Sequence, residues 1–96
     1  MKQLTLLFSV DLSERVRQVL IRAGIEGFLR VPNAVGSKPG ATWKHGRSPE
    51  WRAEMIVAVA ATEAIERVVD ELKTYANKCE VEPCLRILVS HLDAVY

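Results

Sequence analysis

The chain has 96 residues, of which 49% are hydrophobic and 26% are charged, and its formal net charge is +1. This length predicts a single domain over residues 1–96, and the composition excludes a disordered chain and a generally nucleic-acid-binding one. The chain contains two cysteines and no apolar run of membrane-spanning length. Its first residues, MKQLTLLFSVDLSERV, alternate between apolar and polar side chains, so we do not expect a signal peptide. We therefore expect a cytoplasmic protein that has no nucleic-acid partner.

Residues 2–10 alternate between apolar and polar side chains, which predicts a strand with one face toward a core. Asp11, with Glu14 three residues later, predicts the N-cap of a helix that ends at Gly24. The inward residues expected for these two elements are Leu4, Leu6, Phe8, Val10, Leu12, Val16, Val19, Leu20 and Ala23.

Two further strands are expected over 27–34 and 53–60, and the unbroken apolarity of the second one, AEMIVAVA, favours a central position in a sheet. Thr62 predicts the N-cap of a second helix, and LRILVS, residues 85–90, predicts a fourth strand. The inward residues expected for the second helix are Ile65, Val68, Val69, Leu72 and Ala76.

The order of elements is βαββαβ, which predicts an α+β, ferredoxin-like sandwich with two helices on one face of a four-stranded antiparallel sheet. Apolar residues on both faces of the first and third strands leave more sheet than two helices cover. We therefore expect the bare face to be buried in a closed homo-oligomer, with a trimer as one common solution.

The stretch over residues 35–52 is too long for a hairpin turn. It contains three glycines and four basic side chains against one acidic residue, a combination that suits an anion such as phosphate. Trp51, next to the expected third strand, is interpreted as structural, whereas Trp43 is the better candidate for a contact with a partner.

The element order, the chain length and the residues NAVGSKPG, 33–40, resemble the P-II nitrogen-regulator superfamily and its PII-like relatives. The resemblance implies a trimeric signalling protein that binds adenine nucleotides in clefts between subunits and regulates a target through its T-loop, here about residues 35–52. The implied effector residues are Gly36, Lys38 and Gly40 at the base of this loop and Arg86 near the last strand. The residues implied to contact the target protein, a membrane transporter or an enzyme, are Trp43, Lys44, His45 and Arg47.

The sequence also leaves alternatives open. Cys79 and Cys84 are spaced C-x4-C beside Glu80 and Glu82, and the first alternative is a metal- or redox-responsive binding protein that resembles the CutA family. In that reading the bound cofactor is a metal ion rather than a nucleotide. An amino-acid-sensing module that resembles the ACT family is the second alternative. We do not expect an enzyme, because the chain lacks a GxSxG elbow, a Walker loop and an HExxH pair.

Overall fold

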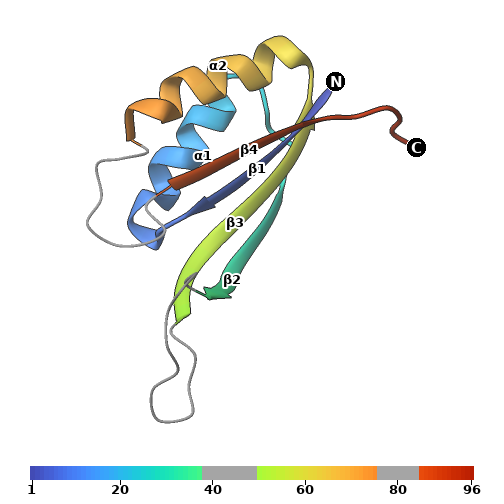
Figure 1. Cartoon of the computed structure of the whole chain (residues 1–96). Coiled ribbons are helices and arrows are strands. Elements are labelled where there is room, and N and C mark those ends of the chain that lie inside the picture. The colour runs from blue at the N-terminus through green and yellow to red at the C-terminus, as the bar shows by residue number, and fades with distance from the viewer. Residues whose placement is uncertain (38–49, 76–84) are drawn as a thin grey trace.

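The structure, a computed structural model, describes residues 1–37, 50–75 and 85–96 (Figure 1). Its four strands form one antiparallel sheet in the order β2-β3-β1-β4, and two helices connect them in a βαββαβ arrangement. The expected α+β, ferredoxin-like fold is therefore confirmed. The elements are β1 Lys2–Phe8, α1 Ser13–Arg22, β2 Leu29–Ser37, β3 Glu50–Ala60, α2 Thr62–Leu72 and β4 Leu85–His91, with short 3-10 helices at Val10–Leu12 and Lys73–Tyr75.

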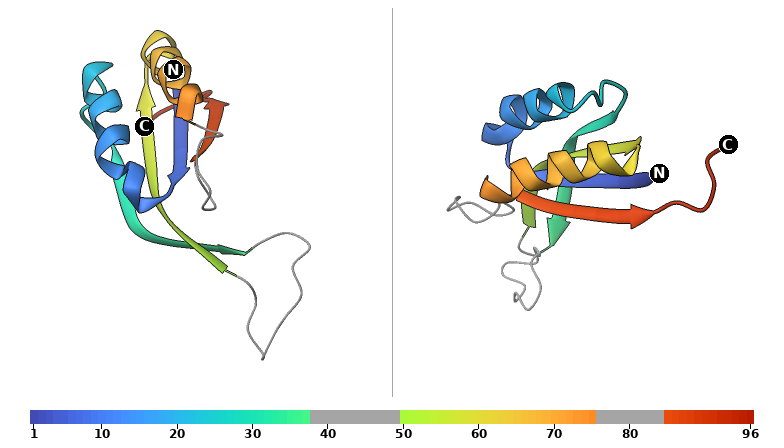
Figure 2. Two further views of the ribbon diagram at one scale, coloured as in Figure 1. Left: turned by 90° about the vertical axis from the view of Figure 1, so that its left-hand side faces the viewer. Right: turned by 90° about the horizontal axis from the view of Figure 1, so that it is seen from above.

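Both helices lie on the same face of the sheet, and the core fills the space between the two layers (Figure 2). The alternation of β1 determines which of its side chains enter the core, since Leu4, Leu6 and Phe8 are fully buried. The expected helix residues pack against them. The buried hydrophobic residues are Leu4, Leu6, Phe8, Val16, Val19, Leu20, Ile25, Ala53, Ile56, Ala58, Ile65, Val68, Leu72 and Leu85.

The start of α1 differs from the prediction. Strand β1 ends at Phe8, the chain makes a 3-10 turn, and α1 begins at Ser13 without a side-chain N-cap, so the N-cap predicted at Asp11 is wrong. Because the strand alternation stops before Val10, this side chain is 62% exposed rather than part of the core. The end of α1 is as predicted, since Gly24 has a φ of +83° and terminates the helix.

The start of α2 also differs by one residue, because Ala61 occupies the N-cap position and Thr62 is the first helical residue. This difference has no effect on the face that the helix presents to the sheet. Ile65, Val68 and Leu72 are buried as expected, and Val69 is partly buried.

Strands β2 and β3 continue further than the sequence indicated. Backbone pairing extends from Ala34 opposite Ala53 to Ser37 opposite Glu50, so the loop predicted over 35–52 is wrong at both ends. A register shift between Val31 and Ala34, next to Pro32, bends β2 at this point. The two strands extend beyond the rest of the sheet as a hairpin (Figure 1).

A buried carboxylate connects the two layers. Glu54 in β3 has a side chain only 4% exposed, and it accepts two hydrogen bonds from Arg30 of β2, with N···O distances of 3.0 and 2.9 Å. The hydroxyl of Ser13, at the start of α1, donates a third bond of 3.0 Å to the same carboxylate. The hydrogen bonds from Arg30 hold the pKa of Glu54 below its ordinary value of 4.5, although desolvation acts in the opposite direction.

The substitution Arg30→Met tests this connection. We expect the free energy of unfolding at pH 7 to fall by about 1–3 kcal/mol, because the buried carboxylate loses a charged hydrogen-bond partner. The folded-state pKa of Glu54 is depressed. The contribution of the Arg30–Glu54 pair to the free energy of unfolding is therefore complete above pH 4.5, and it is lost as the pH falls through the folded-state pKa. Urea denaturation of both proteins across this range should show the difference shrinking in acid.

Arg67→Met is the matched control, because Arg67 is exposed on α2, and we expect a change within about 0.5 kcal/mol. An Arg30→Met loss of equal size at every pH, or no loss at all, would contradict the role assigned to the pair.

Candidate functional site

The base of the β2–β3 hairpin contains a small hollow. Its volume is about 120 Å³, and it lies where the bend in β2 separates that strand from the regular part of the sheet. Arg52 and Asn33 supply its polar side chains, and the rest of its lining is apolar. The lining residues are Val10, Pro32, Asn33, Ala34, Val35, Arg52 and Ala53.

The size of this hollow limits what it holds by itself. Sites for drug-sized ligands and cofactors usually enclose about 300–1,000 Å³. A hollow of about 120 Å³ is smaller than that range, so residues 1–37, 50–75 and 85–96 of one chain do not by themselves enclose a ligand the size of a nucleotide here.

The structure places two of the predicted effector residues on different edges of the sheet. Gly36 lies in β2, where it pairs with Trp51, and Arg86 lies in β4, where it pairs with Leu7 of β1. Strands β2 and β4 are the two edges, separated by three inter-strand steps. At about 4.8 Å per step, the two edges are about 14 Å apart. The two residues therefore do not meet in one chain.

Most other candidate residues lie outside the described residues. This applies to the remaining effector candidates, Lys38 and Gly40, and to both cysteines. It also applies to the four candidates for contact with a target. These residues are Lys38, Gly40, Trp43, Lys44, His45, Arg47, Cys79 and Cys84. Their predicted roles are not tested by the structure.

The sheet face opposite the helices, called the open face below, is largely apolar. Because Leu4, Leu6 and Phe8 point to the helices, the alternate residues of β1 and their cross-strand partners point the other way. Two rows result across the four strands. One row runs Val31, Met55, Leu7, Arg86, and the next runs Leu29, Val57, Thr5, Leu88.

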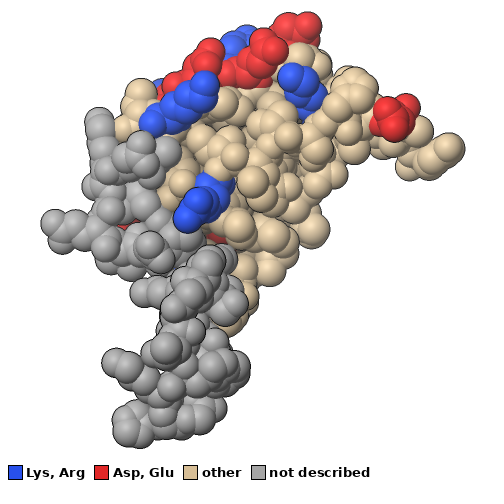
Figure 3. Space-filling view, in the orientation of Figure 1, with Lys and Arg blue, Asp and Glu red and all other residues tan. Residues whose placement is uncertain are grey.

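Two of these apolar side chains are exposed, Leu29 at 63% and Leu88 at 54%, as is Val59 at 39%, which pairs with Gln3 on the same face. In Figure 3 the charged side chains gather over α2, whereas the surface over the strands below it is mostly uncharged. An apolar surface rimmed by polar residues is typical of a protein interface. The structure is thus consistent with the prediction that the two helices leave one apolar face of the sheet uncovered.

The sequence analysis missed the bend in β2 and the hollow that accompanies it. Pro32 within an expected strand was the available signal, because proline in a sheet is confined to edges and bulges. Val10 was assigned to the core and instead lines the hollow.

Within residues 1–37, 50–75 and 85–96, no group of three or more His, Cys, Asp or Glu side chains is arranged to hold a metal ion. No helix in these ranges is both long and apolar enough to cross a membrane.

Several solved structures share this fold. The nitrogen regulatory PII-like protein CPII from Thiomonas intermedia K12, bound to ADP, AMP and bicarbonate, has a TM-score of 0.67 and 17% identity over 93% of this chain and 90% of that one. A DUF3240 family protein from Shewanella baltica has a TM-score of 0.70 and 12% identity over 99% of this chain and 92% of that one. A PII-like signalling protein from Thermus thermophilus has a TM-score of 0.63 and 15% identity, covering 93% of this chain and 83% of that one.

These likenesses confirm that the chain has a PII-like fold. No protein-family model matches the sequence, and no curated protein matches it.

The substitution Val57→Lys tests whether the open face is an interface. Val57 is half-buried at the centre of this face, between Leu29 and Thr5. A lysine there places a charge where a partner subunit would need an apolar surface, so we expect self-association to weaken at least about tenfold. Sedimentation velocity over a dilution series measures this.

Ile21→Lys serves as the control, because Ile21 is an exposed apolar residue on α1, at 54%, away from the open face. Equal self-association of the wild type and the Val57→Lys variant would show that the open face is not the interface.

Proposed function

We propose that the chain is a trimeric, non-enzymatic PII-like regulatory protein that binds a small anionic effector, an adenine nucleotide, at clefts between subunits. In this proposal Gly36, Lys38 and Gly40 of one subunit and Arg86 of a neighbour contact the effector. The segment over residues 38–49, which connects β2 to β3, then transmits the bound state to a target protein.

The observation that carries the proposal is the separation of Gly36 and Arg86. They lie on opposite edges of one sheet, and these edges are about 14 Å apart by strand spacing, so a single phosphate group in contact with both residues would lie between two chains. Association through the open face supplies a way to bring a β2 edge of one chain near the β4 edge of another. The hollow beside the hairpin, too small for a nucleotide alone, would then form one wall of the cleft.

The comparisons support the choice of ligand. CPII, which shares the fold, is bound to ADP and AMP. A nucleotide phosphate requires basic side chains and backbone N–H groups, and the sequence 36–40, GSKPG, provides both types. The cytoplasmic location expected from the sequence is compatible with this ligand.

The proposed mechanism is a shift in the population of loop conformations. Strands β2 and β3 extend away from the body of the protein and are paired up to Ser37 and Glu50 (Figure 1). An effector at the hairpin base would stabilise those loop conformations that contact it best. Target binding through Trp43, Lys44, His45 and Arg47 would then depend on the effector.

Calorimetric titration of ATP, ADP, AMP and cyclic AMP into the wild type and the Arg86→Ala variant tests the proposal. Arg86 is exposed on β4, and loss of one charged hydrogen bond to phosphate should weaken nucleotide binding about 10- to 100-fold. Arg67→Ala, an exposed arginine on α2, should leave the affinity unchanged.

Titrations of copper, zinc and cobalt ions into the same proteins test the metal-responsive alternative. If the wild type binds a metal ion, loses that binding on Cys79→Ser and ignores all four nucleotides, the metal-responsive alternative replaces the proposal.

A further inference from the structure

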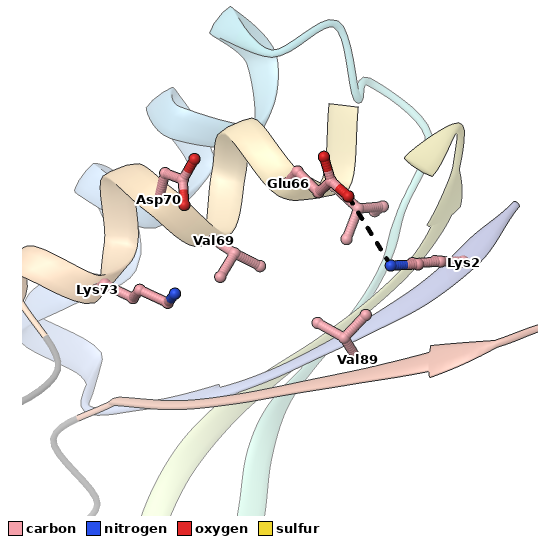
Figure 4. A pocket seen from close by; sticks show the side chains of 7 residues that line it. Lys2, Glu66, Val69, Asp70, Lys73 and Val89 are labelled. Carbon is pink, nitrogen blue, oxygen red and sulfur yellow. Dashed lines mark ion pairs between the residues drawn. The ribbon is translucent and has the colours of Figure 1, made fainter. Parts of the chain in front are cut away.

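Charge distinguishes two hollows in the described part of the chain. The larger one, a groove of about 340 Å³ between α2 and β4, contains two lysines and two acidic side chains, and Lys2 pairs there with Glu66 at 4.0 Å (Figure 4). In contrast, the described residues that line the hollow at the hairpin base include one cation, Arg52, and no acidic side chain. Of these two hollows, only the one at the hairpin base therefore presents an uncompensated positive charge.

Arg52 has an acidic neighbour that does not pair with it. Arg52 and Glu54 are two residues apart in β3, so their side chains point to the same side of the strand. At about 3.4 Å per residue, their Cα atoms are about 7 Å apart, a spacing that long side chains can bridge. No ion pair joins them, and no other side chain among the described residues pairs with Arg52. The N–H donors of its guanidinium group are therefore available to a ligand.

Arg30 and Ser13 explain why Glu54 does not pair with Arg52. Arg30 donates from Nε at 3.0 Å and from Nη2 at 2.9 Å, one bond to each oxygen of the Glu54 carboxylate. The hydroxyl of Ser13 donates the third bond, also at 3.0 Å. This bidentate contact is directional, and the guanidinium group compensates the charge of the carboxylate. Glu54 consequently neither binds Arg52 nor strongly repels an anion beside it.

The hollow at the hairpin base suits one phosphate group. Its volume of about 120 Å³ is several times the space of about 30 Å³ that a water molecule occupies in the liquid, so it has room for a small polar group. The guanidinium group of Arg52 offers parallel N–H donors, a geometry that matches two oxygens of a phosphate. The carboxamide of Asn33, in the same lining, supplies further N–H donors.

We propose that the hollow at the hairpin base binds a phosphate group through Arg52 and Asn33, and that Arg30 is a positioning residue that keeps the Glu54 carboxylate away from Arg52. The inference rests on the proposed function, since the phosphate is taken to belong to the nucleotide effector. It adds a contact from β3 to those proposed on β2 and β4. It also gives the buried Arg30–Glu54 pair a role in affinity as well as in stability.

NMR titration of the full chain with inorganic phosphate and, separately, with ADP tests the binding site. The Nε–H signal of Arg52 and the side-chain amide signals of Asn33 should shift as the ligand saturates the protein. Arg52→Gln should weaken binding of both ligands at least about tenfold, because a charged hydrogen-bond contact is lost. Lys73→Gln, which removes a cation from the groove between α2 and β4, is the matched control and should leave both affinities unchanged.

A second pair of variants tests the positioning role. Arg30→Gln keeps a hydrogen-bond donor for Glu54 but removes the compensating charge. The uncompensated carboxylate, about 7 Å from Arg52 along the strand, should weaken phosphate binding at least about threefold even with a water-like dielectric constant. The double variant Arg30→Gln/Glu54→Gln also lacks the ion pair but leaves no uncompensated charge, so its affinity should return to within about twofold of the wild type. A purely structural role of the pair predicts an equal loss in both variants.

The results separate this proposal from the proposed function. If ADP binds and neither Arg52→Gln nor Arg30→Gln changes its affinity, the nucleotide effector stands and this proposal is overturned. If inorganic phosphate binds through Arg52 and ADP binds no more tightly, the hollow is a site for free phosphate and the nucleotide effector is contradicted. No binding of either ligand, or equal losses in Arg30→Gln and the double variant, would also overturn the proposal. Arg52→Gln leaves the buried network intact, so it tests the site even where Arg30→Gln does not fold.

Discussion

The structure depends on one constraint: a strand presents side chains to both faces of a sheet, whereas the two α-helices in the described part of the chain cover one face. Both helices lie on one face, where they bury the alternate residues of β1 and β3. The remaining residues of the same strands, such as Leu7, Met55 and Val57, form the open face. Covering the apolar side chains of this face would stabilise the protein, because it removes apolar surface from water.

The strand order also separates the candidate effector residues within one chain. In the order β2-β3-β1-β4, the hairpin base and Arg86 belong to opposite edges, and β3 and β1 lie between them. The hollow at the hairpin base is correspondingly small. In our account the open face and the effector site are therefore linked. Association of subunits buries the open face, and the same association brings together the residues that form the effector site.

The fold could be predicted from the sequence because its signals are local. The alternation of Leu4, Leu6 and Phe8 and the end of the first helix at Gly24 depend on neighbouring residues, and both predictions are confirmed. The N-cap prediction at Asp11 failed because the strand ends two residues early and a 3-10 turn uses those positions. Helix starts are sensitive to such shifts of one or two residues.

The parts that could not be predicted depend on contacts between distant residues. Glu54 lies within AEMIVAVA, where a charge in an apolar run gives no indication of its partners. The structure supplies them from 24 and 41 residues away, in Arg30 and Ser13. The extended hairpin was missed for a similar reason, because Gly36 suggests a loop and only pairing with Trp51 makes it part of a strand.

The central claim is that residues of two chains form one effector site, and subunit mixing tests it most directly. Equal amounts of a Lys38→Ala chain and an Arg86→Ala chain are unfolded together, refolded and titrated with nucleotide. In a closed ring with random mixing, about a quarter of the sites receive both intact residues from neighbouring chains, so binding with wild-type affinity, which neither variant shows alone, should return at that level. If mixing restores no binding, although wild-type protein treated in the same way binds normally, the two residues do not meet between chains and the account is contradicted.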